Sequence, residues 1–224
     1  HLRRGVKSED RFSFNNVAAL NATYFANFGA ELAVVSMLPA FFEGTFTLSP
    51  SVAGLVASSF AFVNLFARPL GGLISDSMSS RKLVMIIYMV GIATGFLGMA
   101  FIGEAWPIWL AVTLTIATSM FVQGAEGATF AIIPMVNRRM TGQVAGMAGA
   151  YGNVGAVVYL VVLSLVEERT FFLILAAGAA FAVLYCLLFL KEPEGAFAET
   201  YESAEMDPDA SPTEAGTEQG VPAP

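Results

Sequence analysis

The chain has little of what most enzymes and nucleic-acid-binding proteins need. Its 224 residues include one cysteine and one histidine, and only 13% of them are charged. A single Cys186 cannot build a disulfide framework, and the only histidine is His1, so a His/Cys metal site or a histidine general base is not expected. No phosphate-binding glycine loop and no nucleophile motif is present. These absences argue against an enzyme, a bound metal and an organic cofactor, and the few basic residues argue against nucleic acid as a partner.

Apolar residues, in contrast, are abundant. Hydrophobic residues make up 56% of the chain and 19 of them are Phe, which is more apolar surface than a soluble domain of this length buries. A helix of about 20 apolar residues crosses a hydrocarbon core about 30 Å thick. The sequence therefore predicts an all-α membrane protein, surrounded by lipids, with six transmembrane helices at 16–41, 51–75, 83–103, 107–135, 143–166 and 170–190.

The two ends differ from this apolar middle. Residues 1–13 are short, polar and basic, and residues 192–224 are acidic, rich in Pro and Ala, and free of Lys and Arg. The acidic end cannot bury enough apolar surface to fold alone, so we expect a disordered tail there. The expected organisation is a basic segment (1–13), a six-helix transmembrane domain (14–191) and an acidic tail (192–224).

The basic residues predict how the helices are oriented. Apart from Arg68 and Arg169, every Lys and Arg lies before the first predicted span or just after the second, fourth or sixth. By the positive-inside rule, these regions and both termini face the cytoplasm, as expected for a multi-pass protein of the cytoplasmic (inner) membrane. Because the chain begins with His and has no signal peptide, we also expect it to be a piece of a longer protein.

Arg68 is the most informative residue because it lies inside the second predicted span. A charged side chain at the bilayer centre costs about 2.5 to 3.5 kcal/mol, even on the lenient insertion scale, unless it has a partner or a polar cavity. The sequence therefore predicts a binding site for an anion at Arg68. Two alternatives stay open: the side chain reaches the membrane interface, or it pairs permanently with a neighbouring carboxylate.

A short pattern occurs twice in the apolar region. Gly-Ala-Glu at 29–31 is followed by Pro39, and Gly-Ala-Glu at 124–126 is followed at the same spacing by Pro134. Both copies lie on the first helix of a set of three predicted helices. The pattern indicates two inverted three-helix repeats, which are common in secondary transporters.

The loop after the second span resembles a known motif. Residues 72–82, which contain Asp76 and Arg81, resemble the cytoplasmic hairpin motif of the major facilitator superfamily. In this motif the acid faces the positive end of a neighbouring helix and pairs with the arginine, which acts as a conformational latch. Ser77 and Ser79 replace a basic residue and a glycine of the motif, so we expect a weaker latch. The alternative is an ordinary polar turn.

The fifth predicted span carries a more specific resemblance. Its segment Ala-Gly-Ala-Tyr-Gly-Asn-Val-Gly at 148–155 resembles the signature of the nitrate/nitrite porter family of that superfamily, and segments 23–39 and 121–139 are similar to the same family. Taken alone, such glycines indicate only close helix packing. The resemblance covers residues 14–191 and implies the C-terminal six-helix half of a twelve-helix transporter, whose N-terminal half supplies a second arginine.

The resemblance also implies roles for particular residues. Arg68 matches the substrate-binding arginine, whose planar guanidinium suits a flat oxyanion better than a lysine does. Tyr24 and Phe28 match aromatic positions that stack on the anion and donate a hydrogen bond, although Phe28 alone would be read as packing or lipid-facing. The resemblance also implies that Asn153 supplies an amide donor and that Gly149 and Gly152 let the backbone approach the anion closely. Asn64 either orients Arg68 or only links two helices by a hydrogen bond.

Glu31 and Glu126 are the two remaining carboxylates within the predicted spans. A carboxyl group that alternates between neutral and charged forms could couple proton entry to anion uptake. The alternative is a carboxylate permanently paired with Arg68. The function expected from these observations is secondary active transport of nitrate or nitrite by alternating access, as symport or antiport. Other possibilities are a carrier of another small anion or organic acid, and a membrane sensor that moves no solute.

Overall fold

The computed structural model describes residues 13–78 and 80–191, and these residues are almost entirely helical. The expectations for the basic segment and the acidic tail concern residues outside this range, apart from Ser13. The helices are α1 (Phe14–Phe46), α2 (Pro50–Phe62), α3 (Asn64–Ser77), α4 (Arg81–Met99), α5 (Ile108–Val136), α6 (Thr141–Leu163) and α7 (Glu168–Phe189). A 3₁₀ turn, η2 (Arg138–Met140), precedes α6.

The six predicted spans are confirmed, with one correction. Six helical stretches are long and apolar enough to cross a membrane, and the second of them consists of α2 and α3 together. The prediction treated that span as one helix, but the helix breaks at Val63. The carbonyl oxygen of Phe60, next to this break, accepts a hydrogen bond of 2.6 Å from the Ser119 hydroxyl of α5. A neighbouring helix thus satisfies a backbone group at the break, as membrane-embedded helices require.

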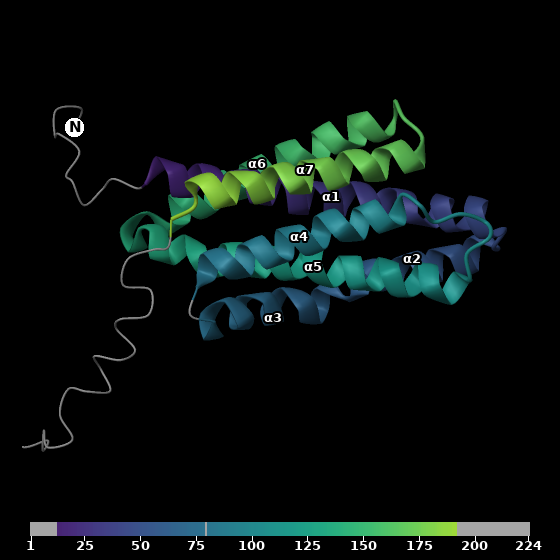
Figure 1. Cartoon of the computed structure of the whole chain (residues 1–224), viewed down its shortest axis with the longest axis horizontal. Helices are drawn as coiled ribbons and strands as arrows, with labels where there is room; N and C mark the ends of the chain where they lie inside the picture. Colours follow the sequence, from purple (N-terminus) through teal and green to yellow (C-terminus); the bar gives the residue numbers. More distant parts are fainter. Residues whose placement is uncertain (1–12, 79, 192–224) are drawn as a thin grey trace, which may run out of the picture. The chain divides into compact units, whose positions relative to one another are not determined.

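The helices pack in a pattern that two related triplets would produce. Helix α1 packs against α5, α6 and α7, α3 packs against α5, and α4 packs against α5 and α7 (Figure 1). In the two triplets, α1 corresponds to α5, α2–α3 to α6, and α4 to α7. When corresponding helices are exchanged, each of these packed pairs becomes a pair of the same set. The bundle therefore has the arrangement expected of one half of a transporter built from inverted repeats.

Two glycine contacts mark equivalent helix crossings in the two triplets. A Cβ on Gly29 of α1 would lie 2.7 Å from the carbonyl carbon of Gly155 in α6, and a Cβ on Gly71 of α3 would lie 2.6 Å from the Cα of Gly124 in α5. Only glycine permits such close approach of two backbones. Gly29 and Gly124 begin the two Gly-Ala-Glu copies, so each glutamate follows a helix crossing by two residues.

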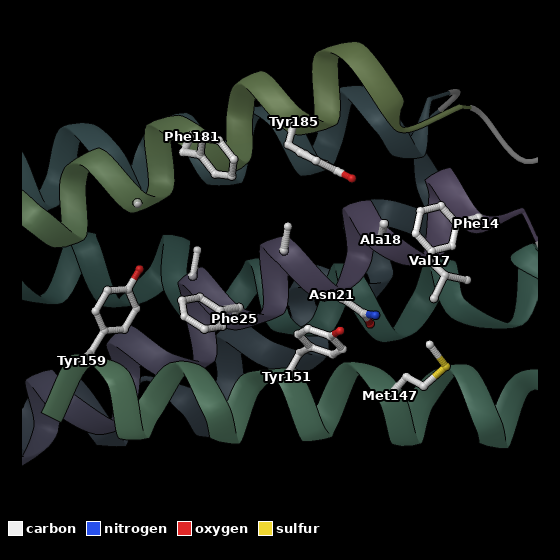
Figure 2. A pocket seen from close by; sticks show the side chains of 13 residues that line it. Phe14, Val17, Ala18, Asn21, Phe25, Met147, Tyr151, Tyr159, Phe181 and Tyr185 are labelled. Atoms are coloured by element: carbon white, nitrogen blue, oxygen red, sulfur yellow. The ribbon is translucent and has the colours of Figure 1, made fainter. Parts of the chain in front are cut away.

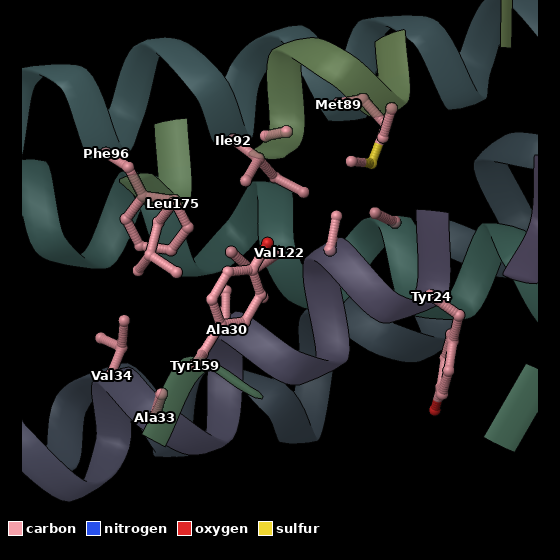
Figure 3. Close-up of a cluster of buried hydrophobic side chains, with 14 of the residues drawn as sticks. Tyr24, Ala30, Ala33, Val34, Met89, Ile92, Phe96, Val122, Tyr159 and Leu175 are labelled. Carbon is pink, nitrogen blue, oxygen red and sulfur yellow. The ribbon is translucent and has the colours of Figure 1, made fainter. Parts of the chain in front are cut away.

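Large apolar side chains fill the space between α1, α4, α5 and α7. Ile92 and Phe96 of α4, Leu175 of α7, Val34 of α1 and Val122 of α5 are all buried in one cluster (Figure 3). Close packing of this kind resists displacement of any one helix. The cluster therefore supports α1 and α5, the two helices that carry the repeated glutamates.

Candidate functional site

Arg68 lies between the two glutamates of the repeated pattern. Its Nη2 atom contacts Oε2 of Glu126 on α5 and lies 3.4 Å from Oε2 of Glu31 on α1. Glu126 is completely buried and the Glu31 side chain is 9% exposed, whereas the Arg68 side chain is 36% exposed. We call these three side chains the ion cluster. In this structure Arg68 is paired with carboxylates, which is one of the alternatives that the sequence left open. Its partners are both Glu31 and Glu126.

Amide side chains complete the surroundings of Glu31. Its Oε1 accepts hydrogen bonds from Nδ2 of Asn64 at 3.0 Å and from Nε2 of Gln123 at 2.8 Å. The Asn64 amide thus donates to Glu31 and links α3 to α1, which is the interhelical alternative. Its predicted role in orienting the Arg68 guanidinium stays a prediction. Gln123 was not among the predicted site residues, although a glutamine inside an apolar span, three residues before Glu126 on one helix face, was an available signal.

The ion cluster is not electrically neutral. One guanidinium faces two carboxylates, so the cluster carries one net negative charge when both glutamates are ionised. The Nε atom of Arg68 is buried and has no hydrogen-bond partner. The guanidinium therefore has a free donor and a partly exposed face, but an added anion would meet net negative charge unless one carboxylate is neutralised.

Two aromatic rings lie on the same face of α1 as Glu31. The rings of Tyr24 and Phe28 stack with centroids 5.1 Å apart and an angle of 9° between their planes. A Cβ on Gly152 of α6 would lie 2.6 Å from the Tyr24 ring and 2.9 Å from the Phe28 ring. Gly152 thus makes room for the two rings, which is a packing role. The predicted stacking of these rings on an anion stays a prediction.

Asn153 and Gly149 lie on the more open side of α6. The Asn153 side chain is exposed, and its Nδ2 donates a hydrogen bond of 2.8 Å to the carbonyl oxygen of Gly149 in the same helix. A Cβ on Gly149 would meet nothing within 4 Å. The amide would have to turn away from its own helix to donate to an anion, and its predicted role stays a prediction.

The predicted pair Asp76–Arg81 is present between α3 and α4. Nη1 of Arg81 lies 2.6 Å from Oδ1 of Asp76. The same nitrogen lies 3.4 Å from the Ser75 hydroxyl and 3.4 Å from the carbonyl oxygen of Ala131 on α5. Arg81 is buried whereas Asp76 is 57% exposed. The arginine therefore connects three helices, and its service as a conformational latch stays a prediction.

A separate pocket of about 400 Å³ lies between α1, α6 and α7. Its walls include Phe25 of α1, Tyr151 and Tyr159 of α6, and Phe181 and Tyr185 of α7 (Figure 2). No charged residue lines it, and it shares no residue with the ion cluster. This pocket is therefore separate from the candidate site at Arg68. Within residues 13–78 and 80–191 there is no group of three or more His, Cys, Asp or Glu side chains that could hold a metal.

Comparison with known proteins identifies the family. The family profile described as Major Facilitator Superfamily matches residues 20–216 of the chain. The chain belongs to the Major Facilitator Superfamily. With six helices able to cross a bilayer, this member of the superfamily is an integral, multi-pass membrane protein.

Individual relatives within the superfamily are close in sequence. The chain is 53% identical over 210 residues to "Nitrate/nitrite transporter NrtP" of Picosynechococcus sp., an alignment that covers 87% of this chain. It is 50% identical over 193 residues, or 86% of the chain, to "Nitrate/nitrite transporter NrtP" of Nostoc punctiforme. It is also 32% identical over 177 residues to "High affinity nitrate transporter 2.5" of Arabidopsis thaliana, in an alignment that covers 76% of this chain. The matched region spans 39% of the length of each NrtP relative and 35% of the Arabidopsis protein.

Proposed function

We propose that the chain is the C-terminal six-helix half of a transporter that moves nitrate or nitrite across the cytoplasmic membrane by alternating access. The observation that carries the proposal is Arg68, a partly exposed guanidinium inside the bundle with an unused donor. Nitrate and nitrite are flat, delocalised anions, and the planar fork of a guanidinium matches their oxygens. The names of the similar proteins support the same substrates.

The substrate contacts proposed for this half combine the ion cluster with the nearby rings and α6. Arg68 supplies the charge, Tyr24 and Phe28 offer ring faces, and Asn153 supplies an amide donor. Gly149 and Gly152 keep this side of α6 free of side-chain bulk, and Asn64 acts through Glu31. Each contact is weak in water but stronger in a dry cavity, where the effective dielectric constant is low.

A second six-helix half is proposed to close the site. The two least buried spans of the bundle are Pro50–Ser77 and Arg138–Leu163, and these contain Arg68 and Asn153. Exposed apolar side chains such as Leu65 and Phe66 on α3, and Val154 and Val157 on α6, lie on the same spans. We propose that the second half packs there and supplies another arginine. Both termini of this half face the cytoplasm, and the chain alone does not transport.

Proton-coupled uptake is the proposed form of transport. An anion that approaches Arg68 competes with Glu31 and Glu126, and neutralising one of these carboxylates by a proton reduces the competition. Anion entry and proton entry are thereby linked, which corresponds to symport rather than exchange.

Uptake of isotope-labelled nitrate and nitrite by vesicles that contain the full-length protein tests the proposal. Arg68→Gln removes the charge and the fork, and we expect uptake to fall about 10- to 100-fold, because hydrogen bonds to charged groups contribute about 1.5 to 3 kcal/mol. Arg68→Lys keeps the charge and should lose most of this uptake as well. The control is Arg169→Gln, which removes an arginine in the first turn of α7, where its guanidinium lies over the Phe101 ring.

Three outcomes would contradict the proposal in different ways. Undiminished uptake by Arg68→Gln would remove Arg68 from the substrate site. Preferential uptake of another small anion or of an organic acid would assign a different substrate. Binding of nitrate without any accumulation in the vesicles would assign a sensor rather than a transporter.

A further inference from the structure

The two carboxylates that hold Arg68 differ in their other partners. Glu31 accepts two hydrogen bonds from amides, at 3.0 Å from Asn64 and at 2.8 Å from Gln123, in addition to its contact with Arg68. Glu126 is completely buried, and neither of its oxygens has a hydrogen-bond partner besides the contact with the Arg68 guanidinium. Glu126 thus depends on one cation for its stability as a carboxylate, and Glu31 does not.

The ionisable side chains near this part of α5 come from three neighbouring helices. They are Arg68 on α3, Glu31 and Tyr24 on α1, and Tyr88 on α4, whose ring lies against Gly124. Arg81 of α4 reaches α5 farther along the helix, at Ala131, where it is paired with Asp76. Helix α2 contributes no ionisable side chain, and Tyr151 and Tyr159 of α6 line the separate apolar pocket. Among the described side chains, Arg68 is therefore the only cation that contacts Glu126.

This difference decides what happens when Arg68 turns toward an anion. Glu31 keeps two amide donors and remains stable as a carboxylate, since hydrogen bonds favour the charged form. Glu126 keeps no donor, and an unpaired carboxylate in an apolar interior is far less stable than its neutral acid. Arg68 can therefore leave Glu126 only when Glu126 carries a proton.

We propose that Glu126 is the proton carrier of the transporter, and that Glu31 stays ionised and positions the site. This rests on the proposed function. A proton binds one carboxylate oxygen of Glu126, Arg68 moves from Glu126 to the anion, and anion and proton leave on the other side as Arg68 returns to Glu126. The site holds one net negative charge both before and after loading, because the bound anion replaces the charge that the proton neutralises. One proton thus accompanies each monoanion at this site.

The test compares Glu126→Gln with the matched variant Glu31→Gln in vesicles that contain the full-length protein. In the wild type, the apparent affinity for nitrate should fall about tenfold for each unit of pH rise in the range where Glu126 is ionised, since one proton binds with each anion. Glutamine at position 126 imitates the neutral acid, so nitrate should bind with no dependence on pH. Nitrate counterflow should persist, while accumulation driven by a pH gradient should be lost. Glu31→Gln should keep the pH dependence of nitrate binding, because Glu126 still has to take up a proton before Arg68 can leave it.

The infrared spectrum gives a readout that does not depend on transport. Nitrate binding should increase the absorption of a protonated carboxyl group in the wild type and in Glu31→Gln, but not in Glu126→Gln. The proposal is overturned if Glu126→Gln keeps the tenfold dependence, or if Glu31→Gln alone abolishes it. Failure of the proposed function has a different signature, since the wild type would then either bind neither nitrate nor nitrite at any pH, or bind them without any accumulation in the vesicles.

Discussion

Replacing Gly152 by alanine should disturb the aromatic pair without touching a charged group. The new Cβ would lie 2.6 Å from Tyr24 and 2.9 Å from Phe28, whereas ordinary contact begins at 3.4 Å, so the rings must move by about 0.8 and 0.5 Å. Tyr24 has little freedom to move, because it is 4% exposed and stacks on Phe28. It also packs edge-to-face against Phe130, with the two ring centroids 5.3 Å apart. Overpacking of this kind destabilises a core by about 1 to 3 kcal/mol.

A ring shift of this size should also reduce transport. A displacement of about 1 Å at a binding site can lower activity about 100-fold, and we expect Gly152→Ala to lower nitrate uptake at least tenfold. Thermal unfolding of the purified full-length protein and isotope uptake by vesicles measure the two effects. Gly44→Ala is the control, because its Cβ would meet nothing within 4 Å and it lies on the same helix as the rings. A Gly152→Ala protein with wild-type stability and uptake would show that the reasoning about this contact is wrong.

Three further substitutions test contacts elsewhere in the bundle. Ser119→Ala should lower the free energy of unfolding by about 1 to 3 kcal/mol, because it leaves the buried Phe60 carbonyl without its donor; an unchanged melting temperature would contradict this. Asn16→Ala should cost about 1 kcal/mol, since Oδ1 accepts the backbone N–H just after α7 at 2.9 Å, and a chemical denaturation series measures the loss. Asp76→Asn should slow uptake with little change in nitrate affinity if its pair with Arg81 is a latch, and equal rates in variant and wild type would remove that role.

Part of the site could be recognised from the sequence. Arg68, Glu31 and Glu126 stand out because charged residues are rare and unfavourable inside apolar spans. The sequence did not predict that one guanidinium contacts both carboxylates, because the partners are far apart in the chain and meet only through the packing of α3 against α5 and of α5 against α1. The sequence places Gln123 near Glu126 on one helix face, but it does not reveal that the Gln123 amide donates to Glu31 on another helix.

The sequence by itself determined that this protein is a bundle of six membrane-spanning helices, because the length of an apolar run and the thickness of a bilayer suffice for that conclusion. The repeated Gly-Ala-Glu pattern likewise indicated two related sets of three helices. Only the tertiary structure decided which donors each glutamate receives, and hence that Glu31 and Glu126 are chemically unequal. Hydrogen bonds and ion pairs depend on distances of about 3 Å between atoms of different helices, and those distances follow from packing that no local pattern encodes.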